Sequence, residues 1–249
     1  MDRIPAAGLG MHLYTVRDLL AADPPGTLTA LAGLGYTCVG VSAFPRPPGE
    51  IRDLCAAAGL DPVVLHVGHA ELTGDRAATL DAAATIGVRW LALSSFPAGM
   101  YTAAGMRLGA RLLTEAGAAA REVGIGVLHH NHATEFRADE GRVLYDILLA
   151  ETDPATVGFE LDVGWAHRAG ADVRRLFAEH PGRFPVLHVK DHDEAGNWTD
   201  VGAGVVDFAR AFVTAAVGGV RYWLVERDDQ PAPADTARRS AEFLEGLRF

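Results

Sequence analysis

The sequence predicts an α/β protein with the (β/α)8 TIM-barrel fold, built as a single domain over residues 1–249. Short apolar segments with the character of buried strands alternate with segments of helical spacing along the chain. Eight such strand–helix units in 249 residues match the usual size of this barrel. Ionisable side chains collect where the predicted strands end, which is the face that carries the chemistry in such barrels.

Each predicted strand is a short apolar run bounded by glycine or by polar residues. The runs are residues 9–14, 37–42, 62–67, 89–94, 125–131, 156–162, 184–190 and 221–226. Several of them follow a glycine at the place where a helix C-cap is expected, namely Gly35, Gly59, Gly87 and Gly124. Strands that each follow a helix end are typical of a parallel sheet with helical crossovers.

Helices are predicted between the strands from apolar residues at three-to-four spacing. The clearest covers residues 106–123, with a stripe of Met106, Leu113, Ala116, Ala120 and Val123. The last covers residues 234–247, with a stripe of Ala237, Ala241, Leu244 and Leu247. The segment 44–49 after the second strand is rich in proline and predicts a stiff loop.

A doubly wound open sheet is the competing fold. It usually carries a Gly-x-Gly-x-x-Gly fingerprint after the first strand, where the phosphates of a dinucleotide bind. Here the first strand continues into Tyr14-Thr15-Val16-Arg17-Asp18, which has no glycine. The sequence therefore favours the closed barrel.

Composition limits the class of protein. With 49% hydrophobic residues the chain can bury a sizeable core, and its formal net charge of −10 disfavours a nucleic-acid partner. Cys38 and Cys55 fall in a predicted strand and helix, which favours small core residues over a disulfide or a metal pair. Residues 1–5 lack the pattern of a signal peptide, and no apolar stretch is long enough to span a membrane. We therefore expect a cytoplasmic protein with no membrane partner.

The fifth strand ends in four polar residues, His129-His130-Asn131-His132. Because side chains alternate along a strand, His130 and His132 share one face, and His129 and Asn131 share the other. Two imidazoles at the mouth of a strand suit a divalent metal or proton transfer, although a buried histidine can also simply bond to the backbone.

The next three strands also end in metal-binding or acid–base groups. Glu160 and Asp162 share one face of the sixth strand, His188 and Lys190 share one face of the seventh, and the eighth ends in Glu226. Imidazole and carboxylate ligands without a thiolate suit an open site for Mn²⁺, Mg²⁺, Co²⁺, Fe²⁺ or Zn²⁺. The sequence therefore predicts a divalent metal cofactor whose identity the residues leave open.

At this point the chain resembles the sugar phosphate isomerase/epimerase family, the xylose-isomerase-like TIM barrels. Members of that family include inosose dehydratases, ketose 3-epimerases and related 3-keto-sugar lyases. The resemblance covers nearly the whole chain. The motifs that carry it are LYTVRD at 13–18, HNHATEF at 130–136, ELDVGW at 160–165, HVKD at 188–191, VGAGVVD at 201–207 and VE at 225–226. They are specific for the superfamily and not for one reaction.

The resemblance implies a metal held by Glu, Asp, His and Glu from strands five to eight. Asp162, His188 and Glu226 match the last three positions, whereas the first is occupied by His130. Either His130 replaces the carboxylate, which we favour, or Glu135 reaches back from the loop. The second strand, Gly40-Val41-Ser42, also departs from relatives that carry a Glu there.

The resemblance further implies proton abstraction next to a carbonyl of a keto-sugar or keto-cyclitol. A bound divalent ion would stabilise the charge that forms on the carbonyl oxygen. With His130 in place of a second Glu, elimination is favoured over a two-carboxylate epimerisation. The expected acid–base groups are Glu226 or Glu135 with His132, and Lys190 would hold a substrate oxygen. Residues expected to bind the substrate are Tyr14, Arg17, His66 and Trp165.

Two other functions stay open at this point. The first is a DNA-repair endonuclease of the abasic-site type, which shares the fold but needs three metals and a basic groove. The second is a barrel that binds sugar without turnover, or that serves as a subunit of a larger complex. The sequence leaves open the substrate, its phosphorylation and the oligomeric state, including a homo-oligomer. Gly202-Ala203-Gly204 is a weak phosphate-binding candidate and reads better as a turn.

Overall fold

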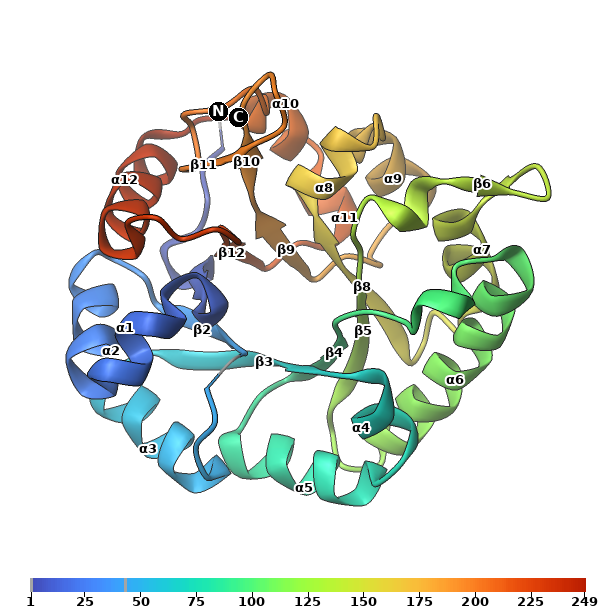
Figure 1. Ribbon diagram of the computed structural model, residues 1–249, viewed down its shortest axis with the longest axis horizontal. Coiled ribbons are helices and arrows are strands. Elements are labelled where there is room, and N and C mark those ends of the chain that lie inside the picture. Colours follow the sequence, from blue (N-terminus) through green and yellow to red (C-terminus); the bar gives the residue numbers. More distant parts are fainter. Residues whose placement is uncertain (1, 43) are drawn as a thin grey trace.

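The computed structural model describes residues 2–42 and 44–249, so Met1 and Ala43 lie outside the described residues. Its eight long-range strands close into a parallel barrel in the order β1-β12-β9-β8-β5-β4-β3-β2. Helices surround this barrel on all sides (Figure 1). The predicted fold is therefore confirmed.

The barrel strands lie within the predicted runs or begin one residue earlier. They are β1 (Leu9–His12), β2 (Cys38–Val41), β3 (Asp61–Val67), β4 (Trp90–Leu93), β5 (Gly126–His130), β8 (Val157–Asp162), β9 (Val186–Val189) and β12 (Tyr222–Val225). Two short antiparallel pairs lie outside the barrel: β6 (Ala138–Asp139) with β7 (Arg142–Val143), and β10 (Asp191–His192) with β11 (Trp198–Thr199).

The helices occupy the connections between strands. They are α1 (Arg17–Ala22), α2 (Pro24–Gly33), α3 (Pro48–Ala58), α4 (His69–Thr73), α5 (Arg76–Ile86), α6 (Ala103–Arg121), α7 (Leu144–Glu151), α8 (Val163–Arg168), α9 (Val173–Glu179), α10 (Phe208–Phe212), α11 (Ala215–Gly218) and α12 (Pro233–Gly246). Among the described residues, none of these helices has the length and apolarity needed to cross a membrane.

The ends of the predicted helices shift by a few residues for identifiable reasons. α6 begins earlier than predicted because the Thr102 side chain accepts a hydrogen bond from Gly105 N and caps the helix. It ends before Val123, which was expected on the buried stripe but is 53% exposed. Gly59 and Gly87 end α3 and α5 in the left-handed conformation, as expected of glycine C-caps.

The barrel interior is apolar at one end and polar at the other. Its lower layer contains Cys38, Val64, Ala92, Leu128, Val186 and Leu224, all fully or almost fully buried. One step further along β5, β8 and β9 the inward positions change to His130, Glu160 and His188. Both cysteines are buried and free, as predicted. The polar layer at the strand ends is thus supported from below by a packed floor.

The segment 201–207 after β11 is held by one buried carboxylate. Asp191 accepts hydrogen bonds from the backbone N–H groups of Gly202, Gly204 and Val206 at 2.9, 3.0 and 3.1 Å, and from His192 N at 2.9 Å. A Cβ at Gly204 would lie 2.3 Å from Asp191 Oδ1, so only glycine fits there. Because these N–H groups already bond to Asp191, the segment Gly202-Ala203-Gly204 is better described as a turn than as a phosphate-binding loop.

Replacing Asp191 with alanine is expected to destabilise the protein by about 3–4 kcal/mol, since it leaves several buried N–H groups without an acceptor. Urea denaturation followed by circular dichroism would measure the loss. Glu194→Ala, at an exposed position of the neighbouring turn, is the matched control and should change stability by no more than about 0.5 kcal/mol. Equal stability of the two variants would contradict this role of Asp191.

Candidate active site and metal centre

A cavity of about 420 Å³ opens at the carboxyl ends of the barrel strands. Side chains from most of the strands line it, which is where a TIM barrel carries its chemistry. The lining residues are His12, Tyr14, Ser42, His66, Ser94, His130, His132, Trp165, Lys190, Glu226 and Asp228. The cavity is therefore unusually rich in imidazole and contains both signs of charge.

The four residues predicted as metal ligands come together beneath this cavity. His130, Asp162, His188 and Glu226 each offer one ligand atom, and these atoms lie within 4.8 Å of one another. All four side chains are buried. They come from β5, β8, β9 and the residue after β12, strands that are neighbours in the closed barrel. Glu135, the alternative first ligand, is not part of this group.

Asp162 is held in place by two kinds of hydrogen bond. Its carboxylate bonds to the helix that follows, and the Asn131 side chain bonds to its backbone. Its Oδ1 accepts a hydrogen bond from Trp165 N at 2.8 Å and caps α8. The Asn131 side chain brackets the same residue, accepting from Asp162 N at 3.0 Å and donating to Asp162 O at 3.3 Å. The second oxygen, Oδ2, is buried, makes no aligned hydrogen bond and lies 3.2 Å from Lys190 Nζ. Asn131 was expected to face away from the site, and its orienting role is a finding of the structure.

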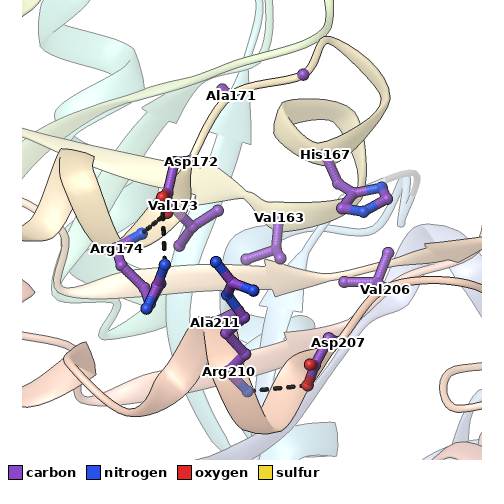
Figure 2. Close-up of a pocket in the computed structure, with 11 residues that line it drawn as sticks. Val163, His167, Ala171, Asp172, Val173, Arg174, Val206, Asp207, Arg210 and Ala211 are labelled. Atoms are coloured by element: carbon purple, nitrogen blue, oxygen red, sulfur yellow. Dashed lines mark hydrogen bonds and ion pairs between the residues drawn. The ribbon is translucent and has the colours of Figure 1, made fainter.

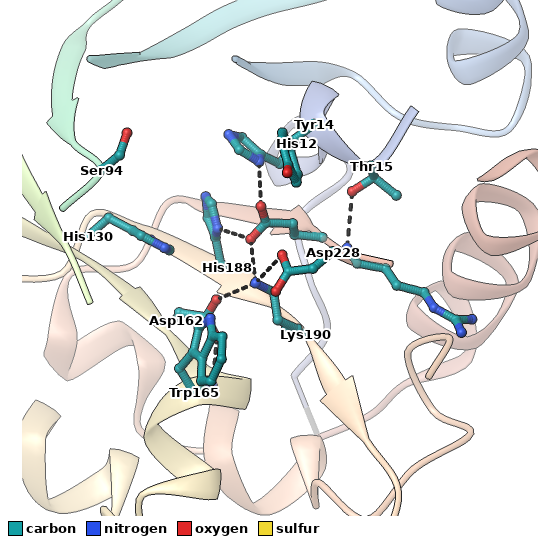
Figure 3. A network of polar contacts seen from close by, with 12 residues as sticks. His12, Tyr14, Thr15, Ser94, His130, Asp162, Trp165, His188, Lys190 and Asp228 are labelled. Carbon is teal, nitrogen blue, oxygen red and sulfur yellow. Dashed lines mark hydrogen bonds and ion pairs between the residues drawn. The ribbon is translucent and has the colours of Figure 1, made fainter. Parts of the chain in front are cut away.

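Glu226 joins three cationic or imidazole side chains. Its Oε1 lies 2.9 Å from His12 Nδ1, and its Oε2 lies 2.7 Å from His188 Nδ1 and 2.9 Å from Lys190 Nζ. Figure 3 shows His12, from β1, converging with His188 and Lys190, from β9 and the residue that follows it. This single carboxylate therefore fixes the positions of groups that are far apart in the sequence.

Lys190 lies among three carboxylates. Its Nζ is 3.2 Å from Asp162 Oδ2, 2.9 Å from Glu226 Oε2 and 2.9 Å from Asp228 Oδ1 (Figure 3). These charges raise the pKa of Lys190 against the opposing effect of burial, so the ammonium stays charged. Asp228 was not singled out by the sequence, and it gives the ammonium a partner at the edge of the cavity.

The pKa values of the two buried acids in the metal group shift in opposite directions. Burial raises the pKa of Asp162 to about 6, although the Lys190 charge opposes it. Burial would also raise the pKa of Glu226, but the charges of Lys190, His188 and His12 hold it well below its usual range. Glu226 is therefore a permanent anion, better suited to holding cations than to acting as a proton acceptor near neutral pH.

The pKa values of the buried histidines also shift in opposite directions. Burial lowers the pKa of His12 to about 4 and holds the pKa of His130 well below its usual range, so both are neutral and offer a lone pair. Burial would lower the pKa of His188, but the carboxylates of Glu160 and Glu226 raise this pKa to about 10. His188 must lose that proton before it can bind a metal.

His132 and Glu135, expected to act together, face different ways. His132 lines the cavity, and burial lowers the pKa of its imidazole. The buried Glu135 carboxylate accepts a hydrogen bond from the backbone N–H of His132 at 2.9 Å and lies 3.6 Å from His129 Nε2. Glu135 thus fixes the backbone at the end of β5, whereas the His132 ring is presented to the cavity.

Three of the four expected substrate-binding residues line the cavity: Tyr14, His66 and Trp165. Arg17 is not among the lining residues. Its guanidinium stacks on Tyr14 at 4.0 Å and donates to Asp228 O at 3.2 Å, so it supports the wall from behind. Trp165 packs edge-on against Trp198, with ring centroids 4.6 Å apart, and the two rings make an aromatic wall.

A separate cavity of about 320 Å³ lies outside the barrel, lined by residues of α8, α9 and α10 (Figure 2). Its carboxylates bond to the starts of two helices: Asp172 accepts from Arg174 N, and Asp207 accepts from Arg210 N. His167 Nδ1 lies 2.9 Å from His192 Nε2. These polar groups are used in local structure, so the barrel cavity is the candidate active site.

Comparisons with known proteins show what the chain is similar to. No protein-family profile matches the chain. Over 155 residues the chain is 29% identical to an inosose dehydratase of Geobacillus thermodenitrificans, an alignment covering 53% of this chain and 51% of that protein. The chain spans about half the length of the curated relatives it matches.

Solved structures show the same fold over the whole chain. A sugar phosphate isomerase/epimerase from Parabacteroides distasonis superposes with a TM-score of 0.83 at 24% identity, covering 98% of this chain and 95% of its own. The IOLI protein, solved with a zinc atom, superposes with a TM-score of 0.71 at 15% identity, covering 96% and 95%. The resemblance predicted from the motifs is confirmed.

Proposed function

We propose that the protein is a divalent-metal-dependent enzyme that removes a proton next to a carbonyl of a keto-sugar or keto-cyclitol. The observation that carries the proposal is the buried group of His130, Asp162, His188 and Glu226 under a polar cavity. The similarity to inosose dehydratases and to a sugar phosphate isomerase/epimerase supports a dehydratase, isomerase or epimerase acting on sugars.

The residues present fit a divalent metal. Two carboxylates and two imidazoles form a ligand set that suits Mn²⁺, Co²⁺ or Zn²⁺, with Mg²⁺ less well matched to imidazole. His130 Nδ1 is buried without a hydrogen-bond partner, as expected of an atom meant for another ligand, and Asp162 Oδ2 faces only the Lys190 ammonium, 3.2 Å away. When bound, the ion supplies Lewis-acid stabilisation of the substrate's carbonyl oxygen.

The side chains in the cavity divide the remaining work. The neutral His132 imidazole faces the cavity and is the group best able to take or return a proton. The Lys190 ammonium, held between Glu226 and Asp228, is a fixed positive charge that can bind a substrate oxygen. The aromatic wall of Trp165 and Trp198 offers a surface for an apolar face of the sugar.

A solvent-exchange experiment tests the reaction class without knowledge of the final product. We expect the metal-loaded protein in D₂O to introduce deuterium at the carbon next to the carbonyl of an inosose or a 3-ketohexose, detected by NMR. Loss of water would identify a dehydratase, and an exchanged substrate or an epimer would identify the other reactions. Binding of these compounds in calorimetry without exchange or product would contradict the proposal and favour the non-catalytic sugar-binding barrel.

Replacing His132 with glutamine is expected to lower the exchange rate by about 10²–10⁴-fold, the usual contribution of a positioned acid–base group. Metal content, measured by elemental analysis, should not change, because His132 is outside the buried ligand group. The control His180→Gln replaces a histidine at the end of α9 and should leave both values unchanged. Full exchange activity of His132→Gln would remove His132 from the mechanism.

A further inference from the structure

One buried carboxylate has no role in the metal group described above. Glu160 is fully buried in the barrel interior and points into a cluster of imidazoles. Its Oε2 lies 2.7 Å from His66 Nε2, and its Oε1 lies 3.0 Å from His188 Nε2. The side chains of His66 and Glu160 are 5% and 0% exposed, so water does not replace these contacts.

These short approaches do not have the alignment of hydrogen bonds. His66 Nε2, His188 Nε2 and both oxygens of Glu160 are buried without a hydrogen-bond partner. Atoms that bind the same metal ion behave in this way, because each points at the ion and not at its neighbour. With ligand distances near 2.1 Å, such atoms lie roughly 3–3.5 Å apart. The approaches around Glu160, 2.7 and 3.0 Å, are at or just below that range, so a small separation of these side chains would accommodate a cation.

The opposite nitrogen of each imidazole is held by a partner. His12 Nδ1 and His188 Nδ1 bond to the two oxygens of Glu226 at 2.9 and 2.7 Å. His66 Nδ1 lies 3.3 Å from Ser94 Oγ. Nε2 of all three rings is then buried without an aligned hydrogen bond, and those of His66 and His188 face the Glu160 carboxylate. Metal-binding histidines typically have their second nitrogen fixed in this manner, often by a carboxylate.

The three rings are also close enough to share one ion. His12, His66 and His188 each offer a ligand atom within 4.8 Å of the other two. They come from β1, β3 and β9, and β9 pairs with β8, where His188 stands opposite Asp162. His188 belongs to both groups: its Nδ1 is hydrogen-bonded to Glu226, and its Nε2 faces Glu160.

We propose that His12, His66, His188 and Glu160 form a second divalent-cation position inside the barrel, adjacent to the group of His130, Asp162 and Glu226. Three imidazoles and one carboxylate suit Zn²⁺, Co²⁺ or Mn²⁺ and disfavour Ca²⁺ and Mg²⁺. The position goes beyond the proposed function, which needs one ion only. The ring of His188 links the two positions.

The test is the metal stoichiometry of the full chain. Protein freed of metal by a chelator is loaded with Zn²⁺ or with Co²⁺, dialysed and measured by elemental analysis, with visible absorption of Co²⁺ as a second readout. Glu160→Gln and His66→Asn each remove a ligand of the new position, and Asp162→Asn removes a ligand of the first position. Melting temperatures check that each variant is folded, and His180→Gln is the control.

We expect two ions per chain in the unchanged protein and one in each of the three site variants. One ion that is lost in Glu160→Gln and His66→Asn but kept in Asp162→Asn supports the new position and contradicts the metal site of the proposed function. One ion that is lost in Asp162→Asn, whether or not the other variants also lose it, overturns the new position. Absence of bound metal in the unchanged protein overturns both.

Discussion

Replacing Glu226 with glutamine is expected to lower turnover of the keto-sugar substrate by at least about 10³-fold, because one carboxylate serves several groups at once. It is part of the buried ligand group, and it contacts His12, His188 and Lys190 within 3 Å. Glutamine keeps the shape but carries no charge, so it can neither neutralise an ion nor hold the imidazoles and the ammonium in place.

Metal content separates this variant from one that affects proton transfer alone. Glu226→Gln should lose bound metal together with activity, whereas His132→Gln should lose activity and keep its metal. Glu122→Gln, at an exposed position after α6, is the matched control and should behave as the unchanged protein. Retention of more than about a tenth of the turnover by Glu226→Gln would show that this carboxylate is not needed for the chemistry.

The fold could be predicted from the sequence because its signals are local. A strand such as β5 is an apolar run preceded by a glycine, and Gly124 and Gly87 have the positive φ expected there. The alternation along that strand also places His130 and His129 on opposite faces. His129 packs outside the barrel, with its ring centroid 5.0 Å from that of Phe96. The ends of elements were misplaced: α6 ends before Val123, the first strand ends at His12 where a 3-10 helix begins, and α3 begins at Pro48 inside the expected loop.

The convergence of His130, Asp162, His188 and Glu226 could be predicted because each residue stands at the end of a strand whose neighbours are known once the barrel closes. The roles of Glu160 and His12 could not, since they depend on contacts across the interior between residues far apart in the sequence. His12 meets Glu226 only when β1 and β12 pair and close the barrel. Glu135 is a candidate metal ligand in the sequence because it follows β5. Its carboxylate instead accepts a hydrogen bond from the backbone N–H of His132.

Removing divalent metal is expected to lower turnover by about 10³-fold, since Lewis-acid stabilisation of a developing oxyanion contributes several kcal/mol. Protein treated with EDTA and freed of the chelator should regain turnover with Mn²⁺, Co²⁺ or Zn²⁺, and less well with Mg²⁺, because imidazole ligands favour the former. Titration of each metal against the exchange rate would rank them.

The fold itself should survive this treatment. The Lys190 ammonium lies close to the carboxylates of Asp162, Glu226 and Asp228. The His188 ring lies between the carboxylates of Glu160 and Glu226. The buried carboxylates therefore keep cationic partners when no metal is bound. Circular dichroism of the metal-free protein should match that of the loaded form, and added metal should raise the melting temperature by mass action. Full turnover of protein shown by elemental analysis to contain no metal would contradict the metal-dependent mechanism, and would leave Lys190 as the cation that stabilises the transition state.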